Sequence, residues 1–191
     1  MRAGLFLSFA LQAAAGHAAL AAGAAGAPAP AQFDKPCVGV GGTATADADD
    51  PAGLSTFVVH GRAALDLVAK ELEKRQVRTS TLFRAPPETH EQGQRTFEWL
   101  MRTRCTRYVD ITFVAKKDAS GPYIGYDVHV VRFELRAAAP GQNSVLNADP
   151  VFSRAYHHPR TVEALARFDP AQDAARIAAD LLAGASLPKA P

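Results

Sequence analysis

The stretch "LMRTRCTRYVDITFV" (Leu100–Val114) joins the end of an amphipathic helix to a strand and contains Cys105, one of only two cysteines. In its second half, Val109, Ile111 and Phe113 alternate with Tyr108, Asp110 and Thr112. This period of two is typical of a strand with one buried face. Three interpretations of Cys105 stay open at this point: half of a disulfide, a reactive thiol, or a cysteine without an assigned role.

The N-terminus favours a disulfide because it predicts export. Arg2 is the only charge before Asp34, and an apolar run from Leu5 to Ala15 precedes small residues with several A-x-A sites. This is the pattern of a cleaved signal peptide, with the cut somewhere in 21–31. The apolar run is shorter than the ~20 residues of a membrane span. We therefore expect a signal peptide over 1–31 and a periplasmic protein, with secretion as the alternative.

Two cysteines in an exported chain favour one bridge. Cys37 begins the run "CVGVGG" and Cys105 precedes "YVDITFV". A bridge between them would close a loop of 69 residues and stabilise the fold by roughly 4 kcal/mol in the chain-entropy model. Arginines 102, 104 and 107 beside Cys105 could instead activate a thiol. We interpret those arginines as ordinary solvated residues.

Hydrophobic spacing outlines a single domain. An apolar stripe from Leu54 to Leu72 predicts a helix, Gln76–Phe83 a strand, and Ala85–Arg104 a second helix. In the second helix, Pro86-Pro87 is expected in the first turn and Phe97, Leu100 and Met101 on the buried face, with Trp99 as an anchor on its flank.

A hairpin and a last helix complete the pattern. The loop Lys116–Pro122 leads into the strand Tyr123–Ala137, whose apolar face changes near Val130-Val131 and so predicts a bulge or strong twist. Ala139–Pro150 is expected as a loop and Val151–His158 as an edge strand. Asp169-Pro170 predicts the start of the helix that buries residues 174, 177, 178 and 181.

The predicted fold is therefore α/β (α+β), a single mixed four- to five-stranded sheet in the order β-α-β-α-β-β-(β)-α, with helices mainly on one face. Short crossovers make the first three strands parallel. If the first and third are neighbours, both begin at the same end of the sheet, where Cys37 and Cys105 would meet. We expect one domain over 36–183 and a flexible tail over 184–191.

Candidate chemistry is sparse, and no catalytic, cofactor-binding or metal-binding residue is assigned. "GVGG" lacks the spacing of a dinucleotide fingerprint, and Asp47–Asp50 lacks the glycine and glutamate of a calcium loop. His157 and His158 should point to opposite faces of a strand, which disfavours a shared metal. Asp110 and Asp127 fall on neighbouring strands and could pair as carboxylates. The formal net charge of +2, about +1 without Arg2, gives no electrostatic footprint for nucleic acid.

The segments "LDLVAKELEKRQVRTSTLF" (Leu65–Phe83) and "FEWLMRTRCTRYVDITFV" (Phe97–Val114) occupy the places of the helix–strand pairs of a small envelope domain. The chain resembles the N-terminal domain of TolB and auxiliary proteins of envelope transport over about 36–183. The glycine that usually ends the first helix is replaced here by Arg75-Gln76. The resemblance implies protein–protein work in the envelope and no catalytic residues.

The leading hypothesis is thus a non-enzymatic periplasmic adaptor that binds an envelope protein and has no membrane span after signal cleavage. The predicted contact is strand addition along the edge strand, at Phe152, Arg154, Tyr156, His157 and His158, or at the bulged hairpin. One alternative is a thiol-dependent or hydrolytic enzyme centred on Cys105. Another is a metal or small-ligand binder that uses His157, His158 or the Asp47–Asp50 loop.

Overall fold

The computed structural model describes residues 33–47, 51–86, 89–136 and 145–189. The predicted signal peptide and most of the Asp47–Asp50 loop lie outside these residues. The elements are, in chain order, β1 (Lys35–Ala46), α1 (Pro51–Glu73), β2 (Thr79–Phe83), α2 (His90–Thr103), β3 (Cys105–Asp118), β4 (Gly121–Arg136), β5 (Val145–Pro159), α3 (Val162–Arg167) and α4 (Pro170–Gly184).

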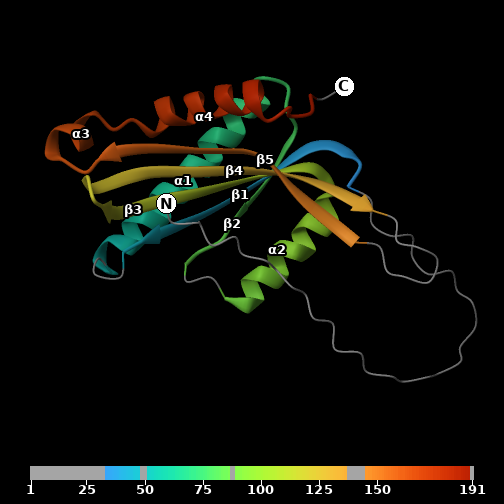
Figure 1. Cartoon of the computed structure of the whole chain (residues 1–191), viewed down its shortest axis with the longest axis horizontal. Helices are drawn as coiled ribbons and strands as arrows, with labels where there is room; N and C mark the ends of the chain where they lie inside the picture. The colour runs from blue at the N-terminus through green and yellow to red at the C-terminus, as the bar shows by residue number, and fades with distance from the viewer. Residues whose placement is uncertain (1–32, 48–50, 87–88, 137–144, 190–191) are drawn as a thin grey trace, which may run out of the picture.

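The strands form one five-stranded sheet in the order β2-β1-β3-β4-β5 (Figure 1). β1 pairs in parallel with both β2 and β3, and the two pairs β3–β4 and β4–β5 are antiparallel. The predicted fold class and strand directions are therefore confirmed. The β3–β4 connection is tighter than the predicted loop, because the two strands pair as far as Asp118 and Gly121.

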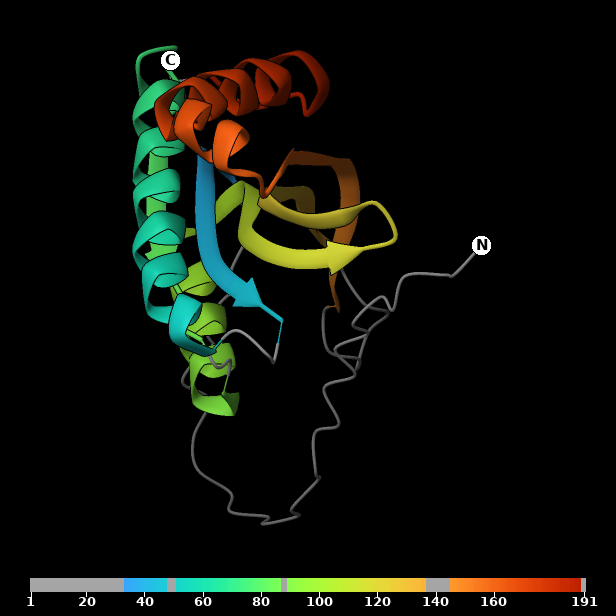
Figure 2. The ribbon, with the colours of Figure 1, turned by 90° about the vertical axis from the view of Figure 1, so that its left-hand side faces the viewer.

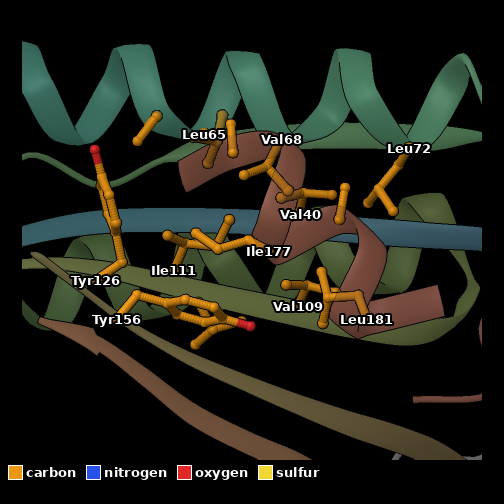
Figure 3. Packing of buried hydrophobic residues seen from close by; sticks show 14 of the residues in the cluster. Val40, Leu65, Val68, Leu72, Val109, Ile111, Tyr126, Tyr156, Ile177 and Leu181 are labelled. Atoms are coloured by element: carbon orange, nitrogen blue, oxygen red, sulfur yellow. The ribbon is translucent and has the colours of Figure 1, made fainter. Parts of the chain in front are cut away.

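The main hydrophobic core lies between the sheet and the helices α1 and α4, which pack against each other (Figure 2). Leu65, Val68 and Leu72 of α1 are fully buried, as the stripe predicted. They meet alternate residues of the central strands and Ile177 and Leu181 of α4 (Figure 3). The alternation in β3 is confirmed, since Val109, Ile111, Phe113 and Ala115 all belong to this core.

Helix α2 covers part of the opposite face, and two predictions about it are wrong. A capping box at Thr89 and Gln92 starts the helix at His90, so Pro86 precedes the first turn. Phe97, which was predicted on the buried face, is 48% exposed, whereas Trp99 is buried, as its predicted role as an anchor requires. Figure 1 shows α2 and α4 on opposite sides of the strands.

The glycines of "GVGG" make room for aromatic rings beneath α2. A Cβ on Gly39 would lie 2.8 Å from the Trp99 ring, and one on Gly41 would lie 2.0 Å from the Tyr108 hydroxyl. Trp99 and Tyr108 themselves meet edge to face at 6.0 Å between ring centroids. Gly39 and Gly41 thus leave room for two large rings against β1, a packing role in place of phosphate binding.

The last strand is longer than predicted. β5 begins at Val145, so the second half of the expected Ala139–Pro150 loop belongs to the sheet, and residues 139–144 lie outside the described part. Its register with β4 shifts between Val130 and Val131, where a bulge or twist was predicted. The extra residue, Val151, is on β5.

The C-terminal helices begin at well-formed caps. Asp169 caps α4 and Pro170 occupies its first turn, as predicted, and the residues 174, 177, 178 and 181 are buried. The short helix α3 was not predicted. After α4, Ala185 is buried and Leu187 packs against the core, so the first residues of the expected tail are packed. Among the described helices, none has the length and apolar character needed to cross a bilayer.

Candidate functional site

Four of the five predicted partner-edge residues lie on the face of β5 that α4 covers. Arg154 and Tyr156 both reach the Asp180 carboxylate on α4, each at 2.9 Å. His158 Nε2 lies 2.8 Å from Asp173, which is itself buried. Phe152 lies against Gly184 at the end of the helix. We call this set of contacts the β5–α4 clasp.

Tyr156 is the centre of the β5–α4 clasp. Its ring is buried, and the guanidinium groups of Arg154 and Arg176 each lie 5.6 Å from the ring centroid. Burial, followed by the hydrogen bond to Asp180, raises the pKa of Tyr156 above its ordinary value near 10. The hydroxyl therefore stays protonated at neutral pH and donates to Asp180.

His157 points to the other face of the sheet. Its Nε2 lies 2.7 Å from Asp127, and its ring stacks on Tyr123 with 4.5 Å between centroids. The prediction that His157 and His158 face opposite ways is thus confirmed. In the part of the chain that the structure describes, no three histidine, cysteine or acidic side chains gather as a metal site.

The open face of the sheet carries further polar pairs. His129 Nδ1 lies 3.0 Å from Ser153 Oγ, and Arg84 binds Asp110 at 2.6 Å. Asp110 also accepts a hydrogen bond from Tyr108. The Asp110–Asp127 carboxylate pair, which the sequence allowed but did not favour, does not form, because Asp110 is opposite His129 in the register. The sequence did not indicate the Arg84–Asp110 pair, which joins residues far apart in the chain.

The row Asp110–His129–Ser153 invites comparison with a hydrolase triad. Its three residues are directly opposite one another on β3, β4 and β5. In a triad, the imidazole binds serine through one nitrogen and an orienting carboxylate through the other. Here the Asp110 oxygen Oδ1 is engaged by Arg84 and Tyr108, and Ser153 is exposed on a strand. Among the contacts of the described residues, none joins His129 to Asp110, so the row lacks the contact between imidazole and carboxylate that a triad has.

Cys37 and Cys105 form the predicted disulfide, with 4.8 Å between their Cα atoms. It joins the starts of the neighbouring strands β1 and β3, as the topology required. Since both cysteines of the chain are in this bond, the thiol on which the Cys105-centred enzyme depends is not available. Disulfides of this kind are typical of proteins that reach an oxidising compartment.

Two of the three arginines near Cys105 differ from the solvated residues we predicted. Arg102 is exposed, but Arg104 binds Asp34 at 2.9 Å. Arg107 is half-buried, and burial followed by the nearby Arg132 lowers its pKa. Asp47 accepts a hydrogen bond from the Lys117 backbone, and residues 48–50 of the predicted calcium-like loop lie outside the described residues.

No protein-family model and no curated protein matches the chain. A search of solved structures matches a PelC dodecamer from Paraburkholderia phytofirmans, at 15% identity and TM-score 0.34, over 86% of this chain and 96% of that one. A second PelC dodecamer from that organism has 16% identity, TM-score 0.34 and coverages of 81% and 92%. A neuraminyllactose-binding hemagglutinin homolog from Helicobacter pylori has 9% identity, TM-score 0.36 and coverages of 82% and 91%.

TM-scores of this size do not establish a common fold, and these proteins assign no role to any residue of this chain. The resemblance to the N-terminal domain of TolB, and the domain limits 36–183 that go with it, stay predictions.

Proposed function

We propose that the chain is an exported, non-enzymatic adaptor of the cell envelope that binds a partner protein by adding the partner's strand to the outer edge of β5. One observation carries the proposal: β5 is a long terminal strand that pairs with β4 on one side, while its side chains are already fixed by α4. The periplasm is the proposed compartment, with secretion as the alternative.

The usable edge is the segment between the bulge and the end of the strand. From Phe152, opposite Val130, to Pro159, opposite Tyr123, the register with β4 is uninterrupted. Pro150 lies at the bulge and has no N–H to donate, so strand addition would stop there. This segment is nearly the same as the predicted edge strand Val151–His158.

The β5–α4 clasp supports strand addition through preorganisation. In such complexes the main-chain hydrogen bonds provide affinity, and ordering a flexible strand opposes it. Because Arg154, Tyr156 and His158 are held by α4, β5 is ordered before any partner arrives. The partner side chains on the open face would then lie beside Ser153, Ala155 and His157.

Site-specific photo-crosslinking in the native cells tests the proposal. Ala155 on β5 and Ala179 on α4 are both exposed alanines, so a crosslinking amino acid at either position leaves the core unchanged. We expect one envelope protein to be captured from position 155 and not from position 179. Equal capture from the two positions, or none from 155, would contradict docking at the β5 edge.

A further inference from the structure

The β3–β4 register brings two arginines together at the disulfide end of the sheet. Arg107 is directly opposite Arg132, one residue pair beyond the buried pair Val109 and Val130 on the same face. Like charges directly opposite each other in an antiparallel pair are destabilising. The register therefore costs stability at this point unless another group compensates for the charge.

Arg107 has few partners for a half-buried cation. Its Nη1 donates to the neighbouring carbonyl of Thr106 at 3.2 Å. Its Nε is buried and, within the described residues, has no hydrogen-bond partner. The structure also shows no ion pair between Arg107 and any described carboxylate. The lowered pKa of Arg107, caused by burial and then by Arg132, agrees with this shortage of negative charge.

Among the described residues, Arg132 forms an ion pair with one acidic side chain. Asp149 on β5 lies 3.3 Å from Arg132, and both side chains are about half exposed. Glu134 is one pair further out on the same face, opposite Asn147. The row Arg107–Arg132–Asp149 thus holds two positive charges and one negative charge.

We propose that Arg107 and Arg132 bind one phosphate group. Two planar guanidinium forks on neighbouring strands need more acceptor atoms than the two oxygens of a carboxylate, and a tetrahedral phosphate supplies them. A singly charged phosphate, either a monoanion or a phosphodiester, would also neutralise the row. The site is independent of the proposed strand addition, because β5 contributes only Asp149 to it.

The probe is inorganic phosphate, measured by titration calorimetry against the full mature chain, with chloride at matched ionic strength as the reference. We expect one phosphate per chain for the native protein. Arg107→Gln and Arg132→Gln should each weaken binding by about tenfold or more, the loss expected for one charge-assisted contact. Arg102→Gln removes an exposed arginine of α2 and should leave binding unchanged.

Two further measurements keep the result interpretable. In phosphate-free buffer Arg107→Gln should be at least as stable as the native chain, because the change removes the repulsion between Arg107 and Arg132. A loss of phosphate binding by this variant would then not be due to unfolding. Competition by phosphatidylglycerol vesicles, and not by phosphatidylcholine vesicles, would identify a lipid headgroup as the source of the phosphate. Binding of inorganic phosphate without such competition would identify a free phosphate. No phosphate binding by the native chain, or equal binding by Arg107→Gln, would overturn the proposal.

Discussion

Reduction of the Cys37–Cys105 disulfide should lower the free energy of unfolding by about 4 kcal/mol. The two cysteines are 68 residues apart in the sequence. In the chain-entropy model the stabilisation rises with the logarithm of the loop length, and a loop of this size lies near the upper part of the usual range. Both cysteines are buried, and the chain-entropy model assigns the stabilisation to the constraint on the unfolded chain.

Urea unfolding followed by circular dichroism measures this difference. The native protein is compared with protein reduced by a phosphine and with the double variant Cys37→Ala/Cys105→Ala. With a slope of about 2 kcal/mol per molar urea, the midpoint should fall by roughly 2 M. The double variant should fall slightly further, because it also loses buried sulfur atoms. Intact mass with alkylation confirms the thiol count in each sample.

A fall of less than about 0.5 M in a fully reduced sample would refute the reasoning. It would mean that the unfolded chain already holds the starts of β1 and β3 close together, because the entropy model assumes that it does not. A reduced protein that loses its native spectrum without urea would instead show that the domain needs the bond to fold.

Three further predictions concern packing at two glycines, the hydroxyl groups of two tyrosines, and the dependence of stability on pH. Gly41→Ala should destabilise the protein by about 2 kcal/mol because its Cβ would overlap the Tyr108 ring. Gly93→Ala should stabilise it by about 0.5 kcal/mol, because Gly93 lies in the first turn of α2 and a Cβ there meets nothing within 4 Å. Urea midpoints of the two variants check both signs. Tyr126→Phe should raise the free energy of unfolding by about 1 kcal/mol, since the buried hydroxyl has no hydrogen-bond partner among the described residues. Tyr156→Phe should lower it by about 1 kcal/mol, because the hydrogen bond to Asp180 is lost. Burial, followed by Asp173, raises the pKa of Tyr126 above the 10.0 of an exposed tyrosine. The stability that this shift contributes is therefore fully present below pH 10 and falls as the pH rises above it. Between about pH 9 and pH 11 the urea midpoint should fall less for Tyr126→Phe than for the native chain, and equal falls would contradict the assignment.

The sheet was predictable because its connections leave little freedom. Two short crossovers require parallel neighbours, and a tight hairpin requires an antiparallel one. Given that β1 and β3 are adjacent, the positions of Cys37 and Cys105 at the two strand starts make the disulfide a consequence of the topology. The same sequence pattern located the irregularity at Val130-Val131, since only a break in the alternation could move the apolar face there.

The packing of α2 was not predictable in the same way. Phe97, Leu100 and Met101 have the spacing of a buried stripe, yet Trp99 is the residue that α2 buries. The helix packs over β1, where Gly39 leaves room for the Trp99 ring and Gly41 for the Tyr108 ring. The spacing of apolar residues in a helix indicates which face is apolar, but it does not show where the facing strand leaves space for a large ring. The glycines, which alternate with Val38 and Val40 in the first predicted strand, were the available signal.

The polar contacts of β5 show a second feature that the sequence alone did not predict, and they also suggest a pattern by which it could be predicted. The alternation along β5 predicted which residues share a face, but not that α4 would lie against that face. Asp173, Arg176 and Asp180 flank the apolar stripe of α4 at helical spacing, and Arg154, Tyr156 and His158 follow one face of β5 at strand spacing. Each member of one series meets a member of the other. A polar series beside the apolar stripe of a helix, matched to a polar series on an edge strand, therefore indicates a side-chain clasp along the border of the core. Where such a clasp occupies the side chains, the main-chain edge of the strand is the part that stays available to a partner, and we place the proposed docking on the backbone of β5 for that reason.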